Sequence, residues 1–248
     1  MPTVLVHGNP ETDAIWGDLR TCLDRRDIIA LSPPGFGAPV PDGFGATSDD
    51  YRDWLAAELE NIDQPIDLVG HDWGGGHVMR IAMERPDLIR SWTMDIAGCF
   101  DPNYVWHDFA QVWQTPDAGE EAIAQMVGQP LEARVEQFVG LGMTHDVAKR
   151  VAAANDQAMG DCILPLYRSA AQPAMTELGQ GLGKAKAKPG LVIIPTGDAF
   201  TGGEAMARRS AEKAGAQIAV LQDRGHWWMC QDPEQGAQVL TNFFATLD

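Results

Sequence analysis

One stretch of the chain carries a residue that could do covalent chemistry. It is LVGHDWGGG at residues 68–76, in which Asp72 stands two positions from Gly70 and two from Gly74. This spacing is typical of a nucleophile elbow, a strained turn from a strand into a helix. Serine usually stands at the centre of such a turn, whereas here it is a carboxylate, which can attack carbon without a base and form an ester. The alternative is an ordinary glycine-rich turn whose surface Asp caps a helix.

Two further loops could complete a triad with Asp72. Asp198 follows an apolar run at residues 191–194, and His226 follows another at 217–221. His226 would be the base, and Asp198 would fix its tautomer and stabilise its charged form. A single loop Asp or His is more often solvated or capping. Three of them at strand ends, in the order nucleophile, acid, base, are a specific signal.

These side chains require a scaffold in which several strands end at one edge. Apolar runs predict strands at residues 3–6, 27–31, 65–69, 91–97, 191–194 and 217–221. Apolar residues at helical spacing predict helices at 15–23, 48–62, 77–84, 203–214 and 233–247. This alternation predicts right-handed βαβ units and a mainly parallel sheet.

The alternation stops over residues 99–188, where only helices are expected. They are predicted at 104–113, 119–126, 131–138, 144–159 and 164–178. We expect this segment to form a helical cap over the carboxyl ends of the strands, where sites of α/β proteins lie. The predicted division is a core domain of residues 1–98 and 189–248 and a cap domain of residues 99–188.

Composition restricts the partners. A net charge of −17 and a pI near 4.6 argue against nucleic acid or an anionic membrane surface as a partner. The four cysteines form no CxxC pair, and neither an export signal nor a bilayer-spanning run is visible, so a cytoplasmic location is expected. No histidine pair has ligand spacing, so no metal is expected. A monomer and a homodimer both remain open.

The motifs together resemble the aspartate-nucleophile branch of the α/β-hydrolase superfamily, which contains haloalkane dehalogenases, epoxide hydrolases and fluoroacetate dehalogenases. HGNP at 7–10, GHDWGG at 70–75, the Gly-Asp at 197–198 and GHWW at 225–228 fall in family order. The resemblance implies an α/β-hydrolase fold whose sheet lacks the first two family strands, and a reaction without metal or organic cofactor. It also implies an oxyanion hole built from the backbone N–H groups of Asn9 and Trp73.

The residues that receive the leaving group separate the members of this branch. A halide leaves as an anion and needs neutral N–H donors, and Asn9 with Trp73 resembles the carboxamide and indole pair of many dehalogenases. An epoxide oxygen needs an acid, which two cap tyrosines supply in the epoxide hydrolases. Tyr167 matches one of them, whereas Phe109 stands at the other position. Three aromatic residues could form an apolar wall of the pocket or simply pack on the core: Trp106, Phe109 and Trp113.

The sequence thus leads to a working hypothesis and its alternatives. The hypothesis is a haloalkane dehalogenase that acts on a small apolar substrate with water, through an alkyl ester on Asp72. The alternatives are an epoxide hydrolase and a catalytically idle hydrolase fold that only binds ligands. Asp95 and Asp101 are alternative acids, because some dehalogenases carry the acid near the end of the strand that precedes the cap.

Overall fold

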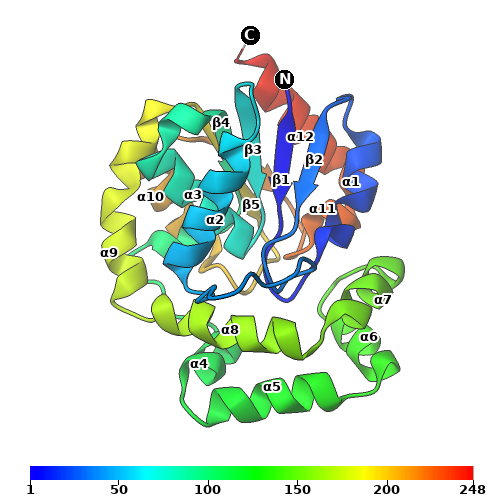
Figure 1. Ribbon diagram of the computed structural model, residues 1–248. Coiled ribbons are helices and arrows are strands. Elements are labelled where there is room, and N and C mark those ends of the chain that lie inside the picture. The colour runs from blue at the N-terminus through cyan, green and yellow to red at the C-terminus, as the bar shows by residue number, and fades with distance from the viewer. Residues whose placement is uncertain (248) are drawn as a thin grey trace.

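Runs of aliphatic residues form one parallel sheet in the computed structural model, which describes residues 1–247 (Figure 1). Within this part of the chain the sheet has six strands in the order β2-β1-β3-β4-β5-β6, and every neighbouring pair is parallel. The strands are β1 (Thr3–Val6), β2 (Ile28–Leu31), β3 (Ile66–Gly70), β4 (Ile89–Met94), β5 (Gly190–Pro195) and β6 (Gln217–Leu221). The predicted α/β class is confirmed.

Helices cover both faces of this sheet. One face carries α2 (Ser48–Glu60), α3 (Trp73–Glu84) and α10 (Gly203–Ala214), and the other carries α1 (Gly17–Cys22) and α12 (Pro233–Ala245) (Figure 1). Short helical turns complete the core: η1 (Asp13–Trp16), η2 (Pro86–Leu88), η3 (Ala97–Phe100) and α11 (Trp228–Gln231). With both faces covered, the inner strands β1, β3 and β5 are buried throughout, and β4 is buried except at Arg90, as expected for a parallel sheet.

The direction of the strands decides where the loops meet. Because all the strands are parallel, their carboxyl ends lie at the same edge of the sheet. Val6 of β1 pairs with Gly70 of β3, so the turns that follow these two strands begin side by side. The loops after β4, β5 and β6 open at the same edge.

Between β4 and β5 the chain is helical. Its helices are α4 (Asp108–Gln114), α5 (Ala118–Gly128), α6 (Leu131–Gly140), α7 (His145–Ala154), α8 (Gln157–Ser169), α9 (Ala174–Gln180) and η4 (Gly181–Ala187). Helices α4 to α8 lie beyond the carboxyl edge of the sheet, whereas α9 returns along the side of the core (Figure 1). The last turn, η4, packs against α3 and α10.

Two long helices predicted in this segment are each interrupted. The helix predicted at 144–159 is wrong, because the chain breaks after α7 and Asp156 caps a new helix by accepting the N–H of Met159 at 3.0 Å. The helix predicted at 164–178 is also wrong. It stops at Ser169, and α9 begins after Pro173, a residue without the N–H that a helix interior needs.

Two boundaries in the core differ from the predictions by more than two residues. The helix predicted to begin at residue 77 begins at Trp73, directly after Asp72, because three consecutive glycines are helical despite their low propensity. The strand predicted at 91–97 ends at Met94, and η3 follows it.

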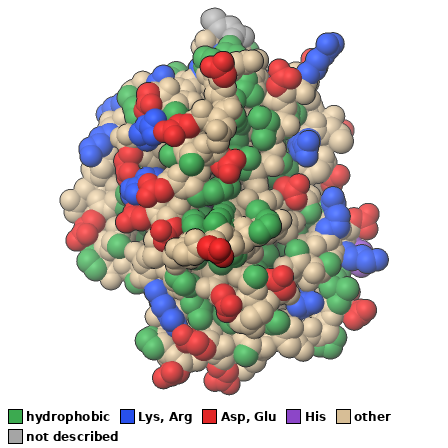
Figure 2. Space-filling view, viewed as in Figure 1, with side chains coloured by type: hydrophobic (Ala, Val, Ile, Leu, Met, Phe, Trp, Pro, Cys, Tyr) green, Lys and Arg blue, Asp and Glu red, His purple; other side chains and the backbone are tan. Residues whose placement is uncertain are grey.

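The surface matches the acidic composition. Acidic side chains are scattered over the face shown in Figure 2, with basic and apolar side chains between them. Among the described residues no helix has both the length and the apolar character needed to cross a bilayer.

Candidate active site

The turn after β3 holds Asp72 in a backbone conformation that side chains rarely adopt. Its φ is 49° and its ψ is −129°, at the point where α3 begins. A Cβ on Gly70 would lie 2.4 Å from the carbonyl oxygen of Gly74, and one on Gly74 would lie 2.2 Å from that of Val6. Only glycine fits at these two positions, so the small residues of the motif are what allow this turn to form.

The structure brings Asp198 and His226 to the same place. His226 Nδ1 lies 2.8 Å from Asp198 Oδ2, and we assign the Nδ1 proton from this hydrogen bond. The other ring nitrogen, Nε2, lies 3.7 Å from Asp72 Oδ1. That distance is too long for a hydrogen bond, so Nε2 faces the nucleophile without being bonded to it.

Burial and mutual charge set the protonation of these three groups. Burial raises the pKa of Asp72 above its ordinary value, although the charge of His226 and the N–H of Asn9 act in the other direction. Burial lowers the pKa of His226, but Asp198 outweighs it and the net shift is upward. Burial likewise raises the pKa of Asp198, and His226 outweighs it to give a net lowering. Asp198 and His226 therefore favour the charged pair.

The predicted oxyanion donors lie against the nucleophile. The backbone N–H of Asn9 donates to Asp72 Oδ2 at 2.9 Å. Trp73 is the first residue of α3, where backbone N–H groups have no partner within the helix. A Cβ on Gly8 would lie 2.2 Å from Asp72 Oδ2 and 2.6 Å from the backbone nitrogen of Trp73. The turn after β1 can approach the elbow this closely because Gly8 has no side chain.

The side chains of Asn9 and Trp73 meet Tyr167 of α8. Asn9 Nδ2 donates to the Tyr167 hydroxyl at 3.2 Å. The Trp73 and Tyr167 rings meet edge to face, with their centroids 5.2 Å apart. Burial and the charge of Asp72 raise the pKa of Tyr167 well above its ordinary value, so the phenol keeps its proton. Asn9 Oδ1 is buried and has no hydrogen-bond partner among residues 1–247. The phenol thus lies beside both predicted leaving-group donors.

A largely apolar cavity of about 90 Å³ opens on Asp72. Its lining includes Tyr167 and two of the three aromatic residues predicted as a wall, Phe109 and Trp113, whereas Trp106 lines a smaller neighbouring cavity. Trp113 contacts the Tyr167 ring at 4.8 Å, whereas Phe109 stacks on Trp113 and is 45% exposed. Trp113 therefore fits both interpretations, whereas Phe109 lines the cavity and is not packed on the core.

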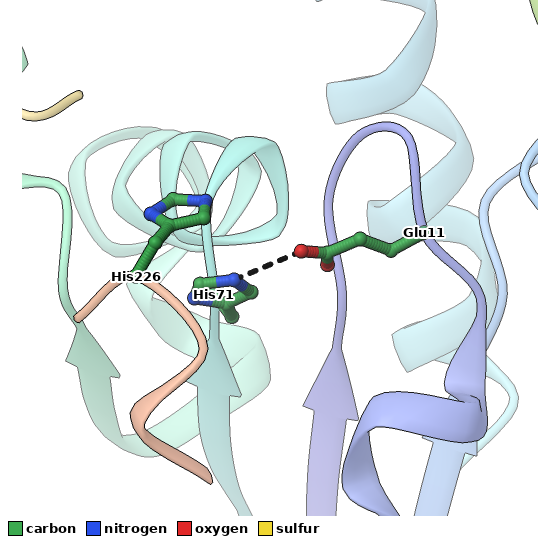
Figure 3. Close-up of side chains that lie close together, drawn as sticks. All are labelled: Glu11, His71 and His226. Carbon is green, nitrogen blue, oxygen red and sulfur yellow. Dashed lines mark hydrogen bonds and ion pairs between the residues drawn. The ribbon is translucent and has the colours of Figure 1, made fainter. Parts of the chain in front are cut away.

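A buried charge network beneath the elbow has no counterpart in the sequence-based predictions. His71 lies between two carboxylates, with Nδ1 2.5 Å from Asp95 Oδ2 and Nε2 3.1 Å from Glu11 Oε1 (Figure 3 shows the second contact). The indole N–H of Trp227 donates to Glu11, and that of Trp228 donates to Asp95. Both indoles directly follow His226 in the chain, and Trp228 is the first residue of α11. No pattern in the sequence marks Glu11, which follows the HGNP turn and is fully buried.

Glu11, His71 and His226 also have the spacing of a metal site, because one ligand atom of each lies within 4.8 Å of the others (Figure 3). The protonation of His71 argues for a different role. Burial lowers the pKa of His71, but Asp95 and Glu11 raise it well above its ordinary value. A doubly protonated imidazole has no lone pair for a metal. The cluster is better described as an ion-pair network that supports the turn.

The two alternative acids have other partners. Asp95 Oδ1 accepts the backbone N–H of Asp72 at 3.1 Å, in addition to the contacts of Oδ2 with His71 and Trp228. Asp101 pairs with Arg209 at 2.7 Å. In the described part of the chain neither carboxylate is bonded to His226, whereas Asp198 is.

Comparisons with known proteins point to one family and one fold. A model of the "Alpha/beta hydrolase family" matches residues 3–239. Haloalkane dehalogenase 2 of Mycobacterium tuberculosis is 33% identical over 176 residues, which are 69% of this chain and 55% of that protein. An epoxide hydrolase of Caballeronia sordidicola is 32% identical over 104 residues, which are 36% of this chain and 29% of that one. The chain thus spans about half the length of the curated dehalogenase.

The solved structures agree on the fold. A loop variant of the haloalkane dehalogenase DbeA from Bradyrhizobium elkanii superposes with a TM-score of 0.73 at 19% sequence identity, over 99% of this chain and 89% of that one.

Proposed function

The chain belongs to the alpha/beta hydrolase family, and from this premise we propose that it hydrolyses its substrate in two steps through an ester on Asp72. The observation that carries the proposal is the position of Asp72. Its carboxylate faces the cavity at a strained elbow, with one oxygen held by the Asn9 N–H and the other facing His226 Nε2. A serine hydrolase would need a hydroxyl here, and no serine stands at the elbow.

In the first step an Asp72 oxygen attacks the substrate carbon and the leaving group departs with the bonding electrons. The carboxylate must be ionised for this attack and needs no base. The hydrogen bond from Asn9 to Oδ2 fixes the orientation of the carboxylate, so that Oδ1 is the oxygen presented beside His226. The apolar lining of the cavity favours the binding of a substrate that has lost part of its hydration shell.

In the second step His226 takes a proton from water, and the hydroxide attacks the carbonyl carbon of the ester. The bond from this carbon to the alkoxy oxygen then breaks, the alkoxide takes a proton from His226 and leaves as the alcohol, and Asp72 is regenerated as a carboxylic acid that loses its proton to solvent. The charge of Asp72 raises the pKa of His226 in the free protein. Ester formation removes that charge, so the pKa of His226 falls when a base is needed. Asp198 stabilises the imidazolium that forms, and the backbone N–H groups of Asn9 and Trp73 stabilise the oxyanion.

We propose a carbon–halogen bond as the bond that is cleaved. The Asn9 carboxamide and the Trp73 indole supply neutral N–H donors for a departing halide, and neither can release a proton to an alkoxide. Residues 99–188 would act as the cap, since α4 and α8 bring Phe109, Trp113 and Tyr167 to the cavity.

An epoxide is the second candidate, and one observation favours it. The Tyr167 hydroxyl accepts an N–H from Asn9 and keeps its own proton, which it could give to an oxygen that leaves the reacting carbon. The second acid of such a pair is missing at Phe109, so Tyr167 would act alone.

Activity on two substrates separates these candidates. We expect wild-type protein to release bromide from 1-bromobutane and to form little diol from styrene oxide. Trp73→Phe and Asn9→Leu should each slow bromide release by about ten- to a few-hundred-fold, because a lost buried hydrogen bond costs about 1–3 kcal/mol. Tyr167→Phe should cost less than either.

An epoxide hydrolase would give the opposite order. Diol formation by the wild type without bromide release, and its collapse in Tyr167→Phe, would rule out the dehalogenase assignment. No turnover of either substrate in this panel would favour a protein that only binds ligands.

A further inference from the structure

His107 lies in the candidate site without an assigned role. It precedes α4 and lines the cavity together with Asp72, Tyr167 and Phe200. Its ring packs edge to face on Phe200 at 5.1 Å, and Phe200 packs in the same way on His226 at 5.2 Å. A half-buried polar ring thus lies among aromatic side chains close to the reacting groups.

The helix that follows fixes the tautomer of this imidazole. The backbone N–H of Ala110 donates to His107 Nδ1 at 3.3 Å, so Nδ1 must carry a lone pair and not a proton. Burial, with the charge of His226, lowers the pKa of His107 to about 4. The ring is therefore neutral near pH 7, and its single proton is on Nε2.

The Nε2–H group has no acceptor among residues 1–247. The only hydrogen bond that His107 makes within this part of the chain is the one to Ala110. Its ring also contacts the rings of Trp106, Phe109, Tyr167 and Phe200, and none of these residues accepts a hydrogen bond from Nε2. An N–H in such surroundings is available to whatever occupies the cavity.

The direction of the first step indicates what that acceptor is. In a displacement at carbon, the leaving group departs on the side opposite the attacking oxygen. Asp72 lies at the edge of the sheet, so the opposite side is the one covered by α4 and α8 (Figure 1). His107 caps α4 at its N-terminus, and Tyr167 lies in α8.

We propose that His107 donates its Nε2–H to the departing halide, as a third donor beside Asn9 and Trp73. This inference rests on the displacement by Asp72 proposed above. The Asp72 oxygen forms the new bond to carbon, and the carbon–halogen bond breaks with its electron pair on the halogen. No proton moves, because a neutral imidazole is a weak acid, and the hydrogen bond strengthens as the halide gains charge.

Two substitutions separate this role from the capping of α4. His107→Ser keeps a cap, since serine is among the preferred N-cap residues, and removes the ring. His107→Phe keeps a ring and removes both the cap and the donor. Asp108→Asn is the matched control, because it changes an exposed neighbouring charge and leaves the imidazole in place.

The readout is the single-turnover rate of halide release from 1-chloro-, 1-bromo- and 1-iodobutane. Chloride leaves with the most concentrated charge, so the rate of its release should depend most on a hydrogen-bond donor. We expect both His107 variants to lose about tenfold on the chloride, the effect of one hydrogen bond to a charged group, and at most about twofold on the iodide. Asp108→Asn should match the wild type on all three.

The remaining outcomes overturn the proposal in distinguishable ways. Equal losses on all three halides would mean that His107 acts only through packing or capping. A loss confined to His107→Phe would assign the effect to the cap. If the wild type released no halide at all, both this inference and the dehalogenase assignment would be wrong, whereas wild-type turnover with unchanged His107 variants would remove this inference alone.

Discussion

Replacement of Asp198 by Asn tests the assignment of the acid. The variant keeps the size of the side chain and removes the charge that faces His226 Nδ1 at 2.8 Å. The first displacement needs no base, so ester formation should be preserved. Hydrolysis of the ester should slow, because the imidazolium loses its counter-charge and the Nδ1–H tautomer loses its acceptor.

The expected magnitude follows from this one contact. A hydrogen bond to a charged group is worth about 1.5–3 kcal/mol, which corresponds to about ten- to 150-fold in rate. Loss of the correct tautomer adds to this, and the total is expected at about 10²- to 10⁴-fold. Stopped-flow measurement of bromide should show one rapid equivalent per active site, followed by a steady state slowed by that factor.

Asp95→Asn is the matched control. Asp95 is bonded to His71, Trp228 and the backbone N–H of Asp72, so its replacement should lower the melting temperature. Its steady-state rate should stay within about tenfold of the wild type in any folded sample, since no contact with His226 is lost. If Asp95→Asn stopped ester hydrolysis while Asp198→Asn left it untouched, the assignment of Asp198 would be refuted.

Three further outcomes are expected away from the acid. Gly8→Ala should abolish bromide release, because its Cβ would lie 2.2 Å from Asp72 Oδ2. The single-turnover rate should fall in acid as Asp72 is protonated. Because the pKa of Asp72 is raised, the fall should begin at a higher pH than for an ordinary carboxyl group, and a rate that stays constant down to about pH 4 would contradict this. Asp67→Asn should destabilise the fold by about 3 kcal/mol in urea titrations, since Asp67 is fully buried against Arg25 and Arg90. Although burial raises the pKa of Asp67, its hydrogen bonds lower it overall, so this difference should be full above about pH 4 and shrink below it.

The positions of the site residues could be predicted mainly from the order of the motifs along the chain. Parallel strands end at one edge, so a residue placed directly after a strand is placed in space as well. The predicted strands at 3–6 and 217–221 agree with β1 and β6 residue for residue, and Asn9 and His226 follow them. The periodicity of apolar residues and the apolar runs are sufficient for this kind of inference, since the parallel sheet brings the ends of the strands to one edge.

The helical segment was harder to predict for two reasons. Its breaks depend on single residues, and its contacts join residues that are far apart in the sequence. The interruption after α7 depends on the capping carboxylate of Asp156, and apolar periodicity continues across it. The contact of Asn9 with Tyr167 joins residues 158 positions apart, and no repeat or spacing encodes it. The network of Glu11, His71 and Asp95 has the same origin, because the ion pairs exist only once β1, β3 and β4 are adjacent.

The most direct test of the central claim is mass spectrometry of His226→Gln after incubation with 1-bromobutane. Without the base the ester should form and then persist, since no water is deprotonated beside it. We predict one butyl adduct per chain, on the peptide that contains Asp72, and no such adduct in Asp72→Asn. If the wild type hydrolyses the substrate and His226→Gln carries no adduct, or carries it on another residue, then Asp72 is not the nucleophile.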